Sequence, residues 1–340
     1  MIVWMGDHLV FSHTMVWLPL ILYAIERRFW LLGILALTSA IFAGFAQPLL
    51  YVVVTSFAYA LYRKSPLLLT VSMFVLSFGI GAIQLLPTWE AFQLSPRATS
   101  DVSYLYDQFL MPISHLISYL APDYLGNPAT YNFLGGGYHE SMLYIGVVPL
   151  LLAFLARKNS TVRFFWVLAG VSLLLGLNLP FVRWFYELGI PIVSTFVPSR
   201  IFFINSFALS ILAAFGFEVL LTKKLFTRLM LLSVLCLVIL GIWYIAKAKE
   251  PVMQRNLVLP AVFLALTALL AATRRWIVVG VFLLTISGQV YFGQKYLSFS
   301  ERQFVYPEHP VFSYLREHAG FNRFWTYGDG YINANFATQY

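Results

Sequence analysis

The sequence predicts an all-helical, polytopic integral membrane protein with about ten transmembrane helices, and its composition carries that prediction. Hydrophobic residues make up 60% of the 340 residues, against roughly 45–50% in a soluble globular chain. Charged residues make up 11%, against about 25%, and the mean hydropathy is +0.78. Because so few charges cannot cover a soluble surface, the composition excludes a cytosolic enzyme, a disordered chain and a fibrous repeat.

Ten apolar stretches with few or no charges are the candidate spans. Several are short, so we expect tilt or local thinning of the bilayer. The run from 29 to 62 contains Gly44, Gln47 and Pro48 at its centre, which favours a tight hairpin of two helices over one long helix. In chain order the candidates are 9–25, 29–45, 48–62, 66–87, 141–156, 164–180, 201–221, 229–246, 257–273 and 276–292.

The basic residues predict how these spans are oriented. Twelve of the 22 fall between alternate spans, joined there by only Glu26 and Glu218. The positive-inside rule places this set in the cytoplasm, so the other acids and all six histidines lie outside. Since topology explains the net charge of +8, we expect no nucleic-acid partner. The twelve are Arg27, Arg28, Arg63, Lys64, Arg157, Lys158, Arg163, Lys223, Lys224, Arg228, Arg274 and Arg275.

The two ends of the chain are both predicted outside the membrane. Residues 1–292 form the transmembrane domain, and 293–340 begin an extracytoplasmic soluble region that is too short for a core of its own. Within that region, 309–319 reads as a short helix closed by Gly320. The single cysteine, Cys236, excludes an intramolecular disulfide and a cysteine metal site.

The long outer loop, about 88–140, is where we expect function. It is rich in tyrosine, and its acidic and basic residues include Glu90, Arg97 and Asp101. Its apolar segment 109–120 is too short to span and predicts a helix lying in the membrane interface. Two interpretations stay open: an aromatic belt with a re-entrant segment, or a platform over a lipid-borne substrate.

A second outer loop, about 181–200, ends at Arg200, where a helix enters the membrane from outside. A guanidinium there can hold a phosphate through two parallel hydrogen bonds. The residues alone favour a snorkelling anchor for lipid headgroups. Glu140, at the start of another span, complements the helix dipole.

The polar residues noted inside the predicted spans are four amides and one histidine. No Asp, Glu, Lys or Arg lies near the centre of a predicted span, which argues against an ion-coupled transporter. The amides are equally suited to bridging helices. These residues are His13, Gln84, Asn178, Asn205 and Gln289.

Four stretches, in order, resemble the YfhO family of polytopic bacterial membrane proteins, and together they cover most of the chain. They are HLVFSHTMVWLPLILYAIER at 8–27, AIQLLPTWEAFQLSPR at 82–97, LAPDYLGNPATYNFLGGGYHESMLYIGVVPLLLA at 120–153 and FVPSRIFFINSFALSILAAFGFE at 196–218. The C-terminal 32 residues resemble the start of that family's extracytoplasmic region.

That family is similar to the GT-C glycosyltransferases, which use polyprenyl-phosphate sugars on the outer face of the membrane. The resemblance implies sugar transfer to a cell-envelope glycopolymer such as a teichoic acid, by a multi-pass protein of the bacterial cytoplasmic membrane. It also implies that the first outer loop, with the catalytic Asp, precedes residue 1. We therefore expect a fragment truncated at both ends and inactive alone. The positions that carry over are Gln84, Pro87, Glu90, Arg97, Glu140, Tyr144 and Arg200.

The chemistry of such a donor indicates roles for some of these residues. Arg200 is the first candidate to bind the phosphate and Arg97 the second, while Glu90 or Asp101 would act as acid, base or ligand of a divalent cation, Mg²⁺ or Mn²⁺. Two alternatives stay open. A lipid or polysaccharide transporter would need a polar cavity across the bilayer. In a non-catalytic envelope scaffold, each acidic residue of the outer loop would be individually dispensable.

Overall fold

Over the residues it describes, the structure is built entirely from helices. This computed structural model describes residues 9–95, 103–134, 137–190, 193–297, 301–302 and 309–320, with only the backbone for Leu9, Val10 and Ala319. Within these ranges the β pairing is a single isolated bridge between Met111 and Leu177. The predicted all-helical class is confirmed for this part of the chain.

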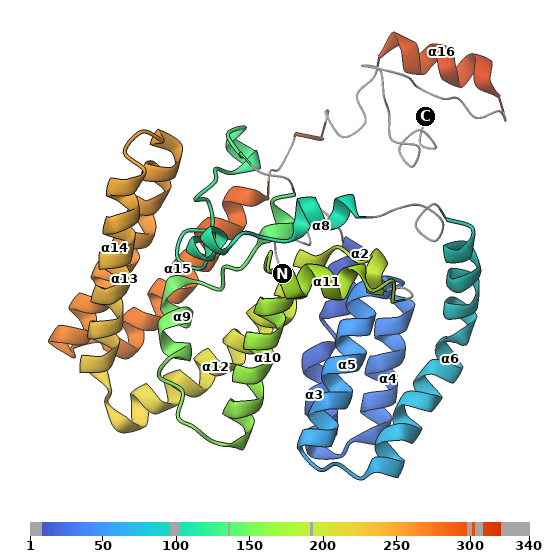
Figure 1. Cartoon of the computed structure of the whole chain (residues 1–340), viewed down its shortest axis with the longest axis horizontal. Coiled ribbons are helices and arrows are strands. Elements are labelled where there is room, and N and C mark those ends of the chain that lie inside the picture. Colours follow the sequence, from blue (N-terminus) through green and yellow to red (C-terminus); the bar gives the residue numbers. More distant parts are fainter. Residues whose placement is uncertain are drawn as a thin grey trace. The chain divides into compact units, whose positions relative to one another are not determined.

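Figure 1 shows the helices in chain order. The α-helices are α2 (Leu9–Met15), α3 (Leu18–Arg27), α4 (Trp30–Phe42), α5 (Ala46–Tyr62), α6 (Leu67–Gln93), α8 (Tyr104–Phe109), α9 (Val147–Ala153), α10 (Ser160–Gly176), α11 (Pro180–Glu187), α12 (Phe202–Lys223), α13 (Phe226–Ala246), α14 (Pro251–Thr273), α15 (Ile277–Tyr296) and α16 (Pro310–Ala319). The 3₁₀ turns are η1 (Ile113–Tyr119), η2 (Pro128–Thr130), η3 (His139–Ser141), η4 (Val193–Thr195) and η5 (Pro198–Ile201).

Five helices among the described residues are long and apolar enough to cross a membrane. They are α6, α13, α14, α15 and the continuous run of η5 and α12. Three shorter apolar helices, α4, α5 and α10, have between 10 and 17 residues. Several membrane helices are therefore present, and the full count of about ten stays a prediction.

Two predicted spans are interrupted in the structure, each beside a proline. The stretch 9–25 is divided into α2 and α3, with Pro19 in the first turn of α3. In 141–156 only Val147–Ala153 is α-helical, and Pro149 lies in its first turn. Proline lacks an N–H and clashes with the carbonyl four residues earlier, so the helix starts close before it.

The hairpin predicted at Gly44 is confirmed. Helix α4 ends at Phe42, α5 begins at Ala46, and Gly44 adopts φ +78° in the turn between them. Glycine accepts this left-handed backbone without a steric penalty. The outer loop begins later than predicted, because α6 continues through Pro87 to Gln93.

The helix predicted over 109–120 is present only in part, as a 3₁₀ helix over Ile113–Tyr119, and its place in the membrane interface stays a prediction. Helix α8 ends at Phe109, Met111 is extended and bridges Leu177, and η1 then covers Ile113–Tyr119. Pro112 explains the break, because it disfavours helical backbone at the residue before it. The segment is instead tied to the end of α10 by the hydrogen bonds from Met111 N to Gly176 O and from Asn178 N to Met111 O.

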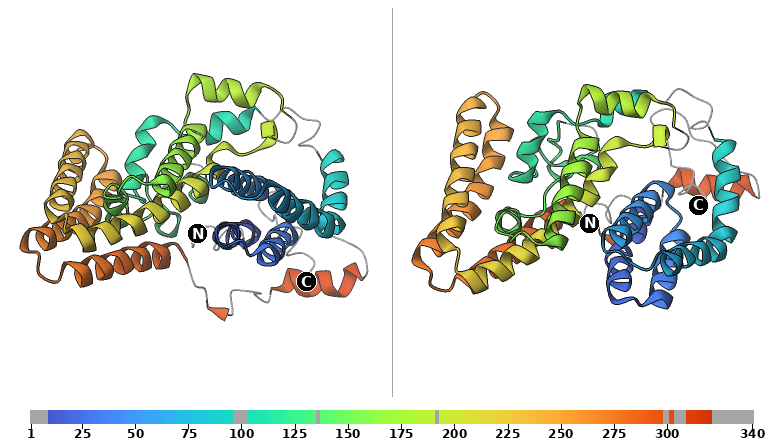
Figure 2. Two further views of the ribbon diagram at one scale, coloured as in Figure 1. Left: turned by 90° about the horizontal axis from the view of Figure 1, so that it is seen from below. Right: turned by 60° about the horizontal axis from the view of Figure 1, so that its bottom comes forward.

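Helix α12 is the central support of the site described below. It packs against α9 and α10, and the three helices lie side by side in Figures 1 and 2. The contact with α9 is so close that a Cβ on Gly216 would lie 1.7 Å from the carbonyl oxygen of Leu152. Only glycine permits that approach.

Four of the five connections that carry predicted cytoplasmic charges lie at one end of the helices. Figure 1 shows the connections α3–α4, α5–α6, α9–α10 and α12–α13 at the same end. We call this the basic end. The arrangement agrees with the alternation that the charges predict, while the side of the membrane that it faces stays a prediction.

The contacts divide the chain into two compact units, 1–297 and 298–340. In the second unit, α16 confirms the short helix predicted there: the His309 side chain accepts a hydrogen bond from Val311 N, and Gly320 follows with φ +53°. The soluble character of 293–340 stays a prediction.

Candidate functional site

A buried ion pair joins two residues that lie 60 positions apart in the sequence. Arg200 lies in η5, just before α12, and Glu140 in η3, just before α9. Arg200 Nη2 lies 2.6 Å from Glu140 Oε1, and Arg200 Nε lies 3.0 Å from each carboxylate oxygen. Both residues are buried, with exposed fractions of 8% and 5%. The forked geometry is the strong form of an arginine–carboxylate bond.

Gln47, near the start of α5, holds this pair against the second outer loop. Its amide nitrogen donates to Val197 O at 2.8 Å and to Tyr51 Oη at 2.9 Å. Its amide oxygen accepts from Arg200 Nη1 and from Val197 N, both at 3.3 Å. Gln47 therefore fixes the approach of η5 to α5, and with it the position of the guanidinium.

Two aromatic rings complete the surroundings of the guanidinium. Arg200 Cζ lies 5.3 Å from the ring centroid of Phe45 and 5.9 Å from that of Phe11, within the range of a cation–π contact. The Phe11 ring also meets Phe203, one turn along α12, at 6.0 Å. The charge thus rests among apolar walls, where electrostatic interactions are stronger than in water.

The carboxyl group of Glu140 stays ionised in this setting. Burial raises the pKa of Glu140, but the neighbouring His139 and the hydrogen bonds from Arg200 lower it by more, and the net pKa lies below its usual value. His139 Nε2 lies 3.6 Å from Glu140 Oε1. Nearby, His115 bonds Ser141 O at 2.6 Å, and its burial holds its pKa below the usual value.

The segment that follows η3 and helix α12 also line an apolar pocket, which we call the α12 pocket. It measures about 360 Å³ and is walled by apolar residues of α2, α3 and α12. Its polar groups are few: Ser206, Ser210, Tyr144 and Gln289. Gln289 donates to the backbone oxygen of Ile145, which joins α15 to this wall. An apolar cavity with a few convergent polar groups is the usual form of a ligand site.

A second buried polar cluster surrounds Asp123. One carboxylate oxygen accepts from Tyr138 Oη at 2.5 Å and Asn127 Nδ2 at 2.9 Å, and the other from Lys295 Nζ at 2.5 Å. Asn256 Nδ2 donates to Asp123 O at 2.6 Å. Burial and the Asp123 charge raise the pKa of Tyr138 well above its usual value. The cluster ties the outer loop to α14 and α15.

Comparison with known proteins now adds to this geometry. The sequence pattern of the family described as "Bacterial membrane protein YfhO" matches residues 2–309. The chain belongs to the YfhO family of bacterial membrane proteins. The suspected family is thereby confirmed over most of the sequence. No curated protein and no solved structure matches the chain.

In this YfhO-family chain, three of the residues carried over from the resemblance come together. Arg200 and Glu140 form the ion pair, and Tyr144 lines the α12 pocket, where its ring meets Phe292 at 5.0 Å. The interpretation of Arg200 as an exposed headgroup anchor is wrong, because its side chain is buried and bonded to Glu140.

The other predicted residues lie apart or outside the described part of the chain. Gln84 is on α6, where its amide lies 3.4 Å from Thr88 Oγ1, and Glu90 is exposed near the end of the same helix. Arg97 and Asp101 lie outside the described residues. Among the described residues, no three His, Cys, Asp or Glu side chains gather to hold a metal ion. The predicted Mg²⁺ or Mn²⁺ thus gains no ligand set there.

Two partners at these sites were not recognised from sequence. The sequence places Gln47 in the turn with Gly44 and Pro48 and does not single out Lys295. A buried amide beside a helix start and a lysine at the end of an apolar helix are weak signals, because each suits ordinary solvation equally well. Of the amides predicted to bridge helices, Asn205 does so: it donates to Ala169 O at 2.7 Å and accepts from Tyr119 Oη at 2.5 Å.

Proposed function

We propose that this YfhO-family chain forms part of a GT-C-type glycosyltransferase that takes a sugar from a polyprenyl-phosphate carrier. The acceptor would be a hydroxyl of a cell-envelope glycopolymer on the outer face of the membrane. The observation that carries the proposal is the α12 pocket, which Phe203 and Phe11 connect to the buried Arg200–Glu140 pair. An isoprenoid phosphate needs an apolar channel for its chain and a cation near its head, and these two elements adjoin here.

Phe203 links the two elements of the proposed site. It lines the α12 pocket and also meets the Phe11 ring beside Arg200. In the proposal, the carrier chain lies along α12 and its phosphate faces the guanidinium side of the pocket. Glu140 acts as a positioning residue, because its two oxygens hold the guanidinium in place.

The proposed reaction exchanges one bond at the anomeric carbon of the sugar. The acceptor hydroxyl oxygen attacks that carbon, and the bond to the phosphate oxygen breaks. Polyprenyl phosphate leaves with the electron pair, and the hydroxyl proton passes to a carboxylate. The proposed carboxylate is that of Glu90, near the end of α6, or that of Asp101, and we derive no step through a divalent cation.

A transporter is less well supported by the pockets. It needs a polar path across the bilayer, because moving a charged headgroup through hydrocarbon is costly. The two largest pockets next to α12 in the described part of the chain are walled mainly by apolar and aromatic side chains. This observation favours a site that accepts a lipid chain over one that conducts a headgroup.

Because the chain is expected to be inactive alone, the test uses native membranes that contain the protein as its native locus encodes it. These membranes are supplied with polyprenyl phosphates that carry radiolabelled glucose, galactose or N-acetylglucosamine. We expect transfer of one labelled sugar to envelope polymer. Ser210→Trp, which fills the α12 pocket from an exposed position, should raise the donor KM at least about tenfold. Ser287→Trp on α15 is the matched control, since Ser287 is exposed and outside that pocket.

Arg200→Gln should reduce transfer by about 10²–10³-fold if the guanidinium stabilises the departing phosphate. Because this change leaves Glu140 buried without its partner, the double variant Arg200→Gln, Glu140→Gln separates lost chemistry from lost folding. Full transfer by a folded double variant would remove Arg200 from the proposal. Unaltered donor KM in Ser210→Trp would remove the pocket.

A further inference from the structure

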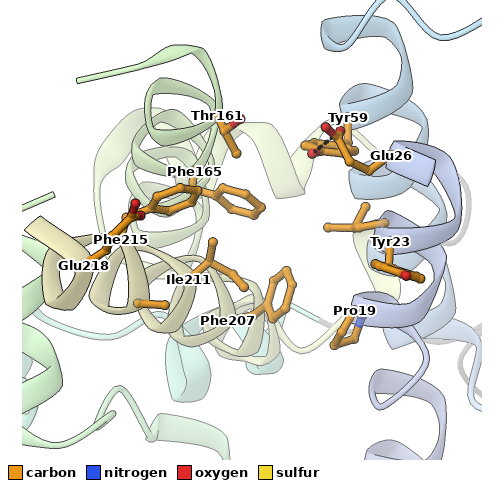
Figure 3. A pocket seen from close by; sticks show the side chains of 12 residues that line it. Pro19, Tyr23, Glu26, Tyr59, Thr161, Phe165, Phe207, Ile211, Phe215 and Glu218 are labelled. Atoms are coloured by element: carbon orange, nitrogen blue, oxygen red, sulfur yellow. Dashed lines mark hydrogen bonds between the residues drawn. The ribbon is translucent and has the colours of Figure 1, made fainter. Parts of the chain in front are cut away.

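A second pocket lies toward the basic end, and we call it the basic-end pocket. It measures about 490 Å³ and is bounded by α3 and α5 on one side and by α10 and α12 on the other. Figure 3 shows its walls, with Phe165, Phe207, Ile211 and Phe215 facing Pro19 and Tyr23. This volume and apolar lining suit the hydrocarbon chain of a lipid.

An unusual acid stands on one wall of this pocket. Glu218 and Lys223 are the only charged residues of α12, and Glu218 lies within the stretch apolar enough to span the membrane. The Glu218 side chain is exposed. Within the described residues, no basic side chain forms an ion pair with its carboxylate. An ionised carboxylate beside apolar walls near the end of a membrane helix favours a cationic partner.

The acid on the opposite wall is already satisfied. Glu26 accepts from Arg63 at 2.6 and 2.9 Å and from Tyr59 Oη at 2.9 Å, and Figure 3 shows it across the pocket from Glu218. This bonding to Arg63 lowers the pKa of Glu26 in spite of its partial burial. The carboxylate that still lacks a cation is therefore that of Glu218.

Positive charge also lies next to residues that line the pocket. The Arg27 guanidinium lies 5.8 Å from the ring centroid of Tyr23, which lines the pocket. Thr161, in the first turn of α10, lines it too, and that turn contains no acidic residue. The N-terminal end of a helix carries partial positive charge, so Arg27 and the start of α10 each favour an anion beside them.

We propose that the basic-end pocket binds a phospholipid whose headgroup carries both a phosphate and a primary ammonium, as in phosphatidylethanolamine. One acyl chain lies between α3 and α12, the ammonium binds Glu218, and the phosphate faces Arg27 and the start of α10. The predicted orientation makes this a lipid of the cytoplasmic leaflet. The proposal stands independently of the glycosyltransferase proposal, which concerns the α12 pocket.

The paired charges distinguish this lipid from its neighbours in the membrane. Phosphatidylglycerol supplies the phosphate but has no ammonium for Glu218. Phosphatidylcholine carries a quaternary ammonium, which has no N–H to donate to a carboxylate. A primary ammonium has three donors and forms the charge-assisted hydrogen bond that Glu218 requires.

The experiment is native mass spectrometry of the full chain released from nanodiscs that contain equal amounts of phosphatidylethanolamine, phosphatidylcholine and phosphatidylglycerol. We expect one retained phosphatidylethanolamine in preference to the other two. Glu218→Gln should reduce that preference about two- to fivefold, the range for one partly solvated ion pair. Ala214→Trp should remove the retained lipid, because Ala214 lines the pocket and a large ring fills it.

Ala265→Trp is the matched control, since Ala265 is an exposed alanine in the apolar middle of α14 and outside the pocket. It should retain the lipid. Equal retention of all three lipids by the unaltered chain, or an unchanged preference in Glu218→Gln, would overturn the proposal. If Ala214→Trp fails to fold, Glu218→Gln, which adds no volume, decides the outcome.

Discussion

At the scale of single residues, the Arg200–Glu140 pair shows how an interior charge is tolerated. Each partner alone would be a buried ion, which is expensive to remove from water. Three hydrogen bonds between them, and one from Arg200 to Gln47, offset that cost. The sequence singles out both residues but does not pair them, because nothing in the local pattern joins positions 140 and 200.

We expect Glu140→Gln to lower the free energy of unfolding by about 3–5 kcal/mol, because it leaves the Arg200 charge buried without a counterion. Chemical denaturation in detergent, followed by tryptophan fluorescence, measures the change. Glu187→Gln is the comparison, since Glu187 pairs with Arg183 on the surface and should cost about 1 kcal/mol or less. Equal effects of the two variants would contradict the assignment of a buried pair.

His115 provides the pH dependence at this scale. Its burial lowers its pKa in the folded chain below the usual 6.5, so the unfolded chain takes up a proton first as the pH falls. The contribution of neutral His115 to stability is therefore complete above about pH 6.5 and is lost as the pH falls below that value. The lowered pKa of Glu140 acts in a separate window, where stability is lost only below its usual pKa of 4.5.

The corresponding measurement is the midpoint of thermal unfolding between pH 5 and 8. We expect the unaltered chain to lose stability toward pH 5, and His115→Gln to lose less over the same interval, because glutamine does not titrate. Parallel profiles for the two proteins would show that other groups cause the decrease.

At the scale of elements, close helix packing and proline positions decide the architecture. Prolines 19, 112 and 149 each coincide with an end or break of helix that hydropathy alone does not reveal. Glycine acts in the opposite way at Gly216, where its missing side chain lets α12 meet the backbone of α9. Hydropathy predicted α12 well because it measures apolar length, but it contains no information about which neighbour the helix touches.

Gly216→Ala should destabilise the chain, because the new Cβ would lie 1.7 Å from Leu152 O and would force α9 and α12 apart. We expect a loss of at least about 1–3 kcal/mol, as for other overpacked interiors. Gly170→Ala on α10 is the matched control: its Cβ meets nothing within 4 Å, and alanine should add up to about 1 kcal/mol of helix stability. The midpoints of denaturant unfolding measure both variants: we expect a lower midpoint for Gly216→Ala and a higher one for Gly170→Ala.

At the scale of the whole chain, the charge pattern makes one strong prediction, the orientation in the membrane. The positive-inside rule places the connection α9–α10 in the cytoplasm and the loop 120–140 outside. In a Cys236→Ala background, Lys158→Cys should react with a membrane-impermeant thiol reagent only after permeabilisation of the cells. Ala129→Cys should react in intact cells. Both positions are exposed in the structure.

Labelling of Lys158→Cys in intact cells, with protection of Ala129→Cys, would reverse the predicted orientation. It would also place the α12 pocket on the cytoplasmic side and end the proposal of transfer on the outer face. The stability predictions for Glu140 and Gly216 would be unaffected, because they depend on contacts within the chain.

The sequence by itself determined the fold class and the helical regions, because apolar length and the alternation of basic residues can be read along the chain. It also determined the family, because four ordered stretches carry the resemblance. Only the tertiary structure decided that Glu140 neutralises Arg200, that Gln47 holds them and that Lys295 reaches Asp123. Each of these contacts joins residues on separate elements. Such pairings depend on how helices approach in space, and any one local pattern is compatible with many approaches.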